Sequence, residues 1–183
     1  TWQATVFDIS RPAVNDASSG GLLTRQIDGQ AHHQGVELSG QTSAISQWTL
    51  GAGYTWLDAK REDSTVTPAI NGQNPINVPN YVLRGVAEYR YRSLPGLRTG
   101  LRVSREGERN VTELGDVKLP AWTIWGASAH YDTKVSHISS TWSLSIDNLT
   151  DKQYWRESPK QFGHYYLYPG APRTVRVGVK ASF

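Results

Sequence analysis

A segment rich in aromatic side chains near the C-terminus is the part of this sequence best suited to bind a ligand. Tyr154, Trp155 and Arg156 begin it, and Tyr165 and Tyr166 follow. Aromatic rings offer rigid, amphipathic contact area at a low entropic cost, and an arginine adds charge-assisted hydrogen bonds to anionic oxygens. The segment therefore predicts contact with a ligand that carries such oxygens. Packing within a loop would use the same tyrosines.

Trp122 is a second candidate for ligand contact because of the face on which it lies. Side chains alternate between the two faces of a strand, and the alternation from Thr123 to Tyr131 puts Trp122 on the polar face, near one end of that strand. A large aromatic ring on a polar face predicts contact with a ligand or, if the strands form a barrel, with a plug that fills its interior.

The remaining candidates argue against a metal centre or an enzyme. His32, His33 and Glu37 are close in sequence, but in a strand His32 points to the face opposite the other two. The three side chains therefore cannot bind one metal ion together. Cysteine is absent, and neither a Gly-x-Ser-x-Gly nor a His-Glu-x-x-His segment occurs. We therefore expect no metal ligands, no directly bound cofactor and no enzymatic activity.

Charge gives no support for a nucleic-acid partner. The 183 residues include 19 Lys+Arg and 16 Asp+Glu, a net charge of +3, and no run of basic residues concentrates it.

The length fits one domain or a piece of a larger one. No stretch of about 18 or more apolar residues exists, which excludes a helical membrane span.

The elements that must position these side chains are strands, because apolar and polar residues alternate with a period of two. At the C-terminus, Val175, Val177, Val179, Ala181 and Phe183 alternate with polar residues and glycine. Comparable alternation covers residues 48–56, 83–91, 97–103, 123–131 and 142–147, with earlier strands around 36–38 and over 1–9. The total is about eight strands, most of about nine or more residues, which suits tilted membrane strands better than soluble ones. No helix is predicted.

Two further patterns favour an antiparallel membrane barrel over a sandwich. Aromatic side chains stand near the ends of apolar faces, as at Trp48, Trp56, Tyr89, Tyr131 and Trp142, which is where aromatic girdles lie. Predicted connections alternate between short ones, near residues 44–46, 93–96 and 133–139, and long ones, near residues 10–24, 60–77, 110–117 and 149–172. Short turns at one end and long loops at the other are typical of outer-membrane barrels.

The end of the chain resembles a known family. Residues 147–155, which read DNLTDKQYW, are similar to the NLxDKxY segment of TonB-dependent outer-membrane receptors, and residues 168–174, which read YPGAPRT, resemble the start of their last strand. Residues 35–38, 79–81 and 119–123 resemble family segments in the same order. The resemblance covers essentially the whole chain, and the siderophore branch, of the ferric hydroxamate, coprogen, pyoverdine and alcaligin kind, is the most similar.

The resemblance implies a fold and a function for the parent protein. The fold is all-β, a plugged antiparallel transmembrane barrel of roughly 22 strands. Residues 1–183 would be its C-terminal part, about the last eight strands, without the plug domain. The implied function is binding of a ferric siderophore at the surface of a Gram-negative cell, followed by import driven by the TonB protein, which would contact the missing N-terminal plug. Outer-membrane lipid and the barrel-assembly machinery would be further partners.

The resemblance also suggests roles for residues near the C-terminus. A ferric siderophore presents anionic oxygens around an iron that is already satisfied, so ligand binding by Trp122 and the aromatic segment needs no protein metal ligand. A terminal aromatic on the lipid face, here Phe183 with Gly178 and Arg176 upstream, resembles the signal that the assembly machinery reads.

Three alternatives remain open at this point. A free-standing eight-stranded outer-membrane barrel with a structural or adhesive role suits the length, since about eight strands can close on side chains alone. Glycines such as Gly51, Gly53, Gly100 and Gly126 would fill its interior poorly. An outer-membrane enzyme lacks a convincing nucleophile and base, and strand length disfavours a soluble β-sandwich.

Overall fold

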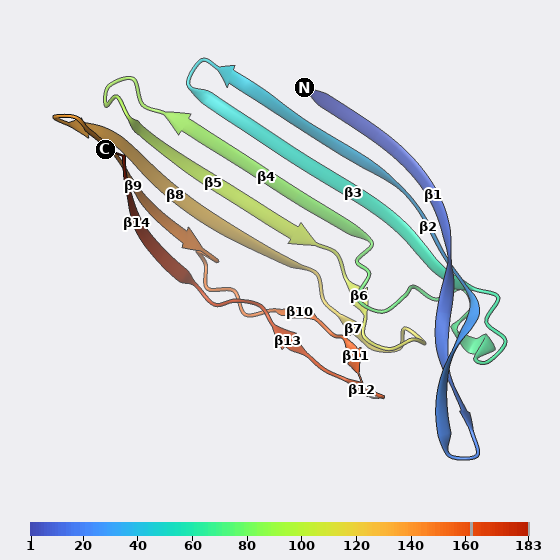
Figure 1. The fold of residues 1–183 in the computed structure, drawn as a ribbon. Coiled ribbons are helices and arrows are strands. Elements are labelled where there is room, and N and C mark those ends of the chain that lie inside the picture. The colour runs from blue at the N-terminus through green and yellow to red at the C-terminus, as the bar shows by residue number, and fades with distance from the viewer. Residues whose placement is uncertain (162, 183) are drawn as a thin grey trace.

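The structure is one large antiparallel sheet with small elements in the loops at one end (Figure 1). The computed structural model describes residues 1–161 and 163–182, with all their side chains except those at positions 19, 23, 43–45 and 135. Eight strands form the sheet in the order β1-β2-β3-β4-β5-β8-β9-β14, and β1 and β14 are its two open edges. The strands are β1 (Trp2–Ser19), β2 (Leu22–Ile45), β3 (Trp48–Glu62), β4 (Tyr81–Arg90), β5 (Leu97–Glu106), β8 (Trp122–Val135), β9 (Ile138–Asp147) and β14 (Thr174–Ser182).

Connection lengths alternate as predicted along most of the sheet. Tight turns at residues 46–47, 91–96 and 136–137 lie at one end, and loops over residues 63–80, 107–121 and 148–173 lie at the other. The loops hold the 3₁₀ turn η1 (Pro68–Ile70) and the short strand pairs β6 (Arg109–Asn110) with β7 (Lys118–Leu119), β10 (Trp155–Glu157) with β13 (Tyr168–Pro169), and β11 (Lys160–Gln161) with β12 (His164–Tyr165).

The prediction that the chain holds no helix is wrong at one point. Pro68 begins the 3₁₀ turn η1, where its fixed φ angle suits the first position and its missing N–H group costs nothing. None of the described residues belongs to a helix that is long and apolar enough to cross a lipid bilayer.

The predicted loop over residues 10–24 is also wrong. These residues are the far parts of β1 and β2, which meet at Gly20 and Gly21. Both glycines have positive φ angles, +60° and +81°, as a two-residue hairpin turn requires. Pro12 suggests the end of a strand, but a register shift between Pro12 and Val14 accommodates it. The hairpin projects beyond the neighbouring strands (Figure 1).

One face of the sheet is apolar and has no covering layer among the described residues. Val177 of β14 lies opposite Leu144 of β9, with Val175 and Val179 on the same face. Val177 is 75% exposed, which is the reverse of what packing against a second sheet produces. The structure therefore excludes a sandwich of these strands and leaves the predicted lipid-facing surface bare.

Aromatic residues stand near both ends of this apolar face, as predicted. At the tight-turn end, the ring centroids of Trp48 and Tyr89 lie 4.8 Å apart. At the loop end, Trp56 of β3 lies opposite Tyr81 of β4. The eight residue steps from Trp48 to Trp56 cover about 26 Å along the strand, or about 20 Å of height at the usual tilt, which fits within the apolar band about 25 Å tall of outer-membrane barrels.

Beyond Trp56, the same face becomes charged. His32 of β2 lies opposite Lys60 of β3, and His32 Nε2 lies 2.6 Å from Asp8 Oδ1. Its neighbour His33 lies on the other face, with Nδ1 3.3 Å from the Ala31 carbonyl oxygen. Within the described part of the chain, no three His, Cys, Asp or Glu side chains are grouped to hold a metal ion.

We expect an arginine at position 177 to destabilise the protein. Val177→Arg would put a charge in the middle of the apolar face, where a lipid-facing arginine costs about 2–4 kcal/mol of folding free energy. Thr49→Arg is the matched control, because Thr49 lies on the polar face opposite Glu88. Guanidinium titration of the intact protein folded into lipid vesicles measures both variants. Equal stability of the two would contradict the lipid-facing assignment.

Candidate functional site

The loop between β9 and β14 is closed at its base by Asn148. This buried side chain donates from Nδ2 to the carbonyl oxygens of Lys152 and Ala171, at 2.9 Å each, and accepts from the Lys152 N–H group at 2.8 Å. Asp151 Oδ1 accepts a further hydrogen bond from the Arg173 N–H group at 2.9 Å. The segment that carries the family resemblance is therefore a structural clamp, a role that the sequence alone did not reveal.

A cavity of about 660 Å³ lies beside this clamp, between the loop and the start of β8. The ring centroids of Trp122 and Tyr154 lie 4.6 Å apart, with 41° between their planes. A Cβ atom at Gly170 would be 2.0 Å from Tyr154 Cζ, so a side chain there would displace the tyrosine ring. Aromatic and proline side chains provide much of the lining: Pro120, Trp122, Tyr154, Trp155, Pro169 and Pro172.

Trp122 is more enclosed than its position on the polar face suggested. It is only 7% exposed, because its ring packs against Tyr154. Its indole Nε1 has no hydrogen-bond partner within the described chain, which leaves an unsatisfied donor in a residue that lines the cavity. Burial raises the pKa of the Tyr154 phenol above its ordinary value, so this hydroxyl stays protonated. Ligand contact by either residue stays a prediction.

The structure brings Tyr154 and Trp155 of the predicted aromatic segment to the cavity, but not Arg156, Tyr165 or Tyr166. Trp155 lines it and is 43% exposed. Arg156 pairs instead with the next residue along the chain, at 3.9 Å. Tyr165 and Tyr166 are exposed and lie farther along the loop, where the Tyr165 ring centroid is 5.7 Å from Lys160 Nζ. These residues form a second exposed group, and their contact with a ligand stays a prediction.

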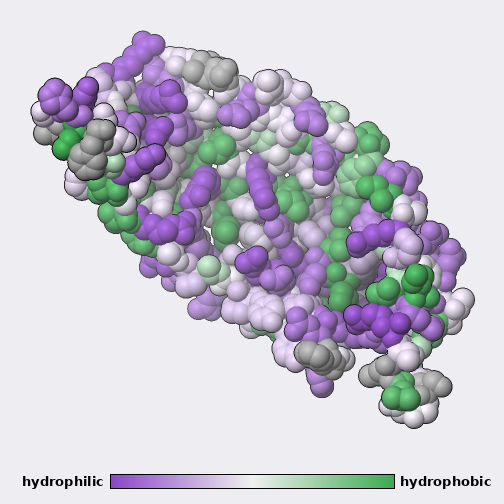
Figure 2. Space-filling model, viewed as in Figure 1, coloured by the Kyte–Doolittle hydropathy of each residue, from purple (hydrophilic) through white to green (hydrophobic). Residues whose placement is uncertain are grey.

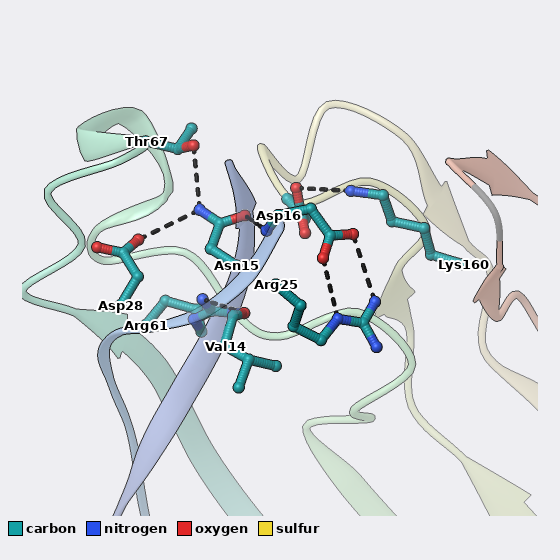
Figure 3. A network of polar contacts seen from close by, with 9 residues as sticks. Val14, Asn15, Asp16, Arg25, Asp28, Arg61, Thr67 and Lys160 are labelled. Atoms are coloured by element: carbon teal, nitrogen blue, oxygen red, sulfur yellow. Dashed lines mark hydrogen bonds and ion pairs between the residues drawn. The ribbon is translucent and has the colours of Figure 1, made fainter. Parts of the chain in front are cut away.

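A buried carboxylate holds the β3–β4 loop against the projecting hairpin (Figure 3). Asp28 accepts hydrogen bonds from the Ser64 hydroxyl, from the N–H group of Thr65 at 2.8 Å, and from Asn15 Nδ2 at 3.2 Å. Asn15 Nδ2 also donates to Thr67 Oγ1 at 3.1 Å. These donors, the Ser64 hydroxyl first, hold the pKa of the Asp28 carboxyl far below its usual range.

Two ion pairs continue this network across the loops (Figure 3). Arg25 Nε lies 2.9 Å from Asp16 Oδ1 on the hairpin, and Lys160 Nζ lies 3.2 Å from Glu113 Oε2. The second pair joins the β9–β14 loop to the β5–β8 loop. A smaller cavity of about 230 Å³ lies among these four side chains and Arg61. The loop end of the sheet is therefore one connected structure with a charged surface.

The polar face of the sheet carries a third ionic group. Asp147 of β9 accepts hydrogen bonds from Arg102 of β5, at 2.6 Å, and from Arg176 of β14. Arg102 reaches across β8 over Gly126, where a Cβ atom would be 3.0 Å from Arg102 Nη2. A cavity of about 550 Å³ lies on this face. Figure 2 shows a face on which strongly hydrophilic side chains stand over the middle of the sheet.

The predicted assembly signal is only partly within the described residues. Arg176 pairs with Asp147 as above, and Gly178 packs under Ser143, whose hydroxyl donates to the Gly178 carbonyl oxygen at 3.1 Å. Phe183 lies outside the described residues. The role of all three in assembly stays a prediction.

Comparison with known proteins gives consistent matches. The family described as "TonB dependent receptor-like, beta-barrel" matches residues 1–149. The ferrichrome receptor FcuA of Yersinia enterocolitica is 31% identical over 180 residues, which cover 97% of this chain and 23% of that protein. The ferrioxamine receptor of the same organism is 24% identical over 85% of this chain and 21% of that protein.

A solved structure is similar over the whole chain. The ferric preacinetobactin receptor BauA of Acinetobacter baumannii matches with a TM-score of 0.84 and 27% identity, covering 100% of this chain and 27% of BauA. The chain therefore spans less than a third of the length of these relatives.

We expect Asp28→Asn to loosen the β3–β4 loop. Asp28 Oδ1 accepts hydrogen bonds from the N–H groups of Thr65 and Val66, at 2.8 and 3.2 Å. The amide lacks the charge that attracts these donors, so both N–H groups should exchange faster with deuterated water, as measured by mass spectrometry. Asp16→Asn is the control, since Asp16 contacts Arg25 rather than this loop. If the N–H groups of Thr65 and Val66 exchange at the parental rate in Asp28→Asn, Asp28 does not hold this loop.

The lowered pKa of Asp28 also sets a pH dependence. A carboxyl whose folded-state pKa is depressed contributes stability above its unfolded pKa, about 3.9, and loses it only as the pH falls through the lowered folded value. The loop should therefore keep its protection from about pH 7 to about pH 4, after correction for intrinsic exchange rates. Loss of protection within that range would show that the carboxylate is not held as described.

Proposed function

This chain belongs to the family of TonB-dependent receptor-like β-barrels, and from that membership we propose that its parent receptor binds a ferric siderophore outside the cell and imports it with energy supplied through TonB. The chain would be the C-terminal part of the barrel, in the outer membrane of a Gram-negative bacterium. TonB would act on an N-terminal plug domain that lies outside these residues. Iron would enter as part of the cargo, and the barrel would catalyse no reaction.

The aromatic cavity at the loop end of the sheet is the observation that carries this proposal. Its volume of about 660 Å³ falls within the usual range for small-molecule sites, about 300–1,000 Å³. Trp122, Tyr154 and Trp155 bring flat rings to it. The protonated Tyr154 hydroxyl and Lys152 Nζ, both from residues of the lining, are donors that suit the anionic oxygens around a chelated iron.

The residue types in the cavity fit a metal complex better than a bare ion. A siderophore already fills the coordination positions of its iron, so the receptor needs contact area and hydrogen-bond donors rather than metal ligands. The cavity lining supplies rings, prolines, Lys152 and Gln153. Its one carboxylate, Asp151, is engaged by the Arg173 N–H group. Relatives named for ferrichrome and ferrioxamine make these two complexes the first ligands to test.

The remaining partners follow from the two faces of the sheet. The bare valine face of β14 suits acyl chains of the outer membrane. The ionic group of Arg102, Asp147 and Arg176 suits a water-filled or plugged interior. Recognition by the barrel-assembly machinery would use Arg176, Gly178 and Phe183, as the resemblance implies.

A free-standing eight-stranded barrel fits the described residues poorly. Such a barrel would pair its first and last strands, because closure is what removes the exposed edges. Here β1 and β14 are the two edges of an open sheet. An open sheet of this kind is what a segment of a wider barrel would contribute.

We expect Trp155→Ala combined with Tyr165→Ala to weaken binding of ferrichrome or ferrioxamine by the intact receptor. Aromatic contacts are worth about 0.5–1.5 kcal/mol each, so the pair should raise the dissociation constant about 5- to 150-fold. Binding of complexes carrying radiolabelled iron measures this without relying on tryptophan fluorescence. Trp142→Phe, on the apolar face, is the control. If the double variant binds these complexes with unchanged affinity, the proposed binding site is wrong.

A further inference from the structure

Asn77 lies where three of the long loops meet. It belongs to the β3–β4 loop, and its backbone N–H group donates to the Asn110 carbonyl oxygen of the β5–β8 loop at 3.0 Å. Its side-chain Oδ1 accepts from the backbone N–H group of Ser158, in the β9–β14 loop, at 2.6 Å. Asn110 strengthens the junction by donating from Nδ2 to the Asn74 carbonyl oxygen at 3.0 Å. One residue therefore holds the other two loops at once.

The backbone at this junction favours asparagine for a second reason. The φ angle of Asn77 is +62°, in the left-handed region that most side chains avoid but that asparagine tolerates better than most. Glycine would adopt the same conformation without strain, but it would supply no acceptor. The position therefore demands two properties that asparagine combines.

The hydrogen bond from Asn77 reaches the middle of the aromatic segment. Ser158 is fully buried, at 0% exposure, and it lies between Trp155, which lines the cavity, and the strand pair β11–β12, which carries Tyr165. A buried backbone N–H group needs a hydrogen-bond partner, because leaving it unpaired costs far more free energy than leaving one unpaired in contact with water. Loss of the Asn77 acceptor would therefore displace Ser158 together with the residues on both sides of it.

A second link joins the same segment to a neighbouring loop. Lys160, two residues after Ser158, pairs with Glu113 of the β5–β8 loop at 3.2 Å. Because this pair is partly exposed, its contribution is modest, and the buried bond to Asn77 is the stronger of the two anchors.

We propose that Asn77 is a positioning residue for the siderophore site: it touches no ligand, but it sets the pose of Trp155 and of the β11–β12 pair by holding the Ser158 backbone. This inference rests on the proposed function. It makes the β3–β4 loop a determinant of affinity even though none of its residues lines the aromatic cavity.

Two substitutions at the same position separate the hydrogen bond from the backbone. Asn77→Gly keeps the positive φ angle and removes the acceptor, whereas Asn77→Asp keeps an acceptor for the Ser158 N–H group. In the intact receptor, Asn77→Gly should raise the dissociation constant for ferrichrome or ferrioxamine about tenfold, and Asn77→Asp should stay within about twofold of the parent. Asn74→Ala is the matched control, because the Asn74 side chain forms no hydrogen bond within the described residues.

A double-mutant cycle distinguishes positioning from general destabilisation. If Asn77 acts through Trp155 and the β11–β12 pair, Asn77→Gly should cost little further affinity in a receptor that already carries Trp155→Ala and Tyr165→Ala. Because Asn77→Gly removes a hydrogen bond between loops and none between the strands of the sheet, it should lower the melting temperature of the barrel by only a few degrees. Equal effects of Asn77→Gly in both backgrounds, or parental affinity of Asn77→Gly alone, would overturn the positioning role while leaving the proposed function intact. Failure of the parent receptor to bind either complex would overturn both.

Discussion

Hydrogen bonding between neighbouring strands is the constraint on which this structure depends. A sheet with one face in lipid has no water on that side to satisfy a backbone N–H or C=O group, so each strand must find its partners in the next strand. The eight strands meet this demand by pairing in order along the chain. Side chains are then free to differ between faces: valine, leucine and aromatic residues on one side, and the Arg102–Asp147–Arg176 group on the other.

Because of this constraint, residues that serve function can vary more freely in the loops than in the strands. Within the strands a substitution is limited by lipid or by the crowded polar face, whereas the loops need only close their own hydrogen bonds. They do so with single buried polar side chains: Asp28 for the β3–β4 loop, Asn148 for the β9–β14 loop, and Asn77 between them. The aromatic cavity is built on this frame, with one wall from the start of β8 and the other from the clamped loop.

Periodic features were predictable from the sequence, and contacts between distant residues were not. The alternation of Val175, Val177 and Val179 predicted both the strand and its apolar face, because alternate side chains share a face. The far part of the first hairpin was missed, since its polar and small residues show no one-sided pattern and Pro12 suggests an end. Ser158 and Asn77 are 81 residues apart, and no local pattern marks such a bond. The prediction for Trp122 had the face right but not the packing under Tyr154.

The two open edges have a practical consequence. Strands β1 and β14 each present a row of unpaired backbone groups beside a bare apolar face, which is the arrangement that recruits further strands from other molecules. In aqueous buffer, the two edges and the apolar face together favour association between copies of the chain. Detergent would cover the valines but not the edges, whose backbone groups only further strands can pair.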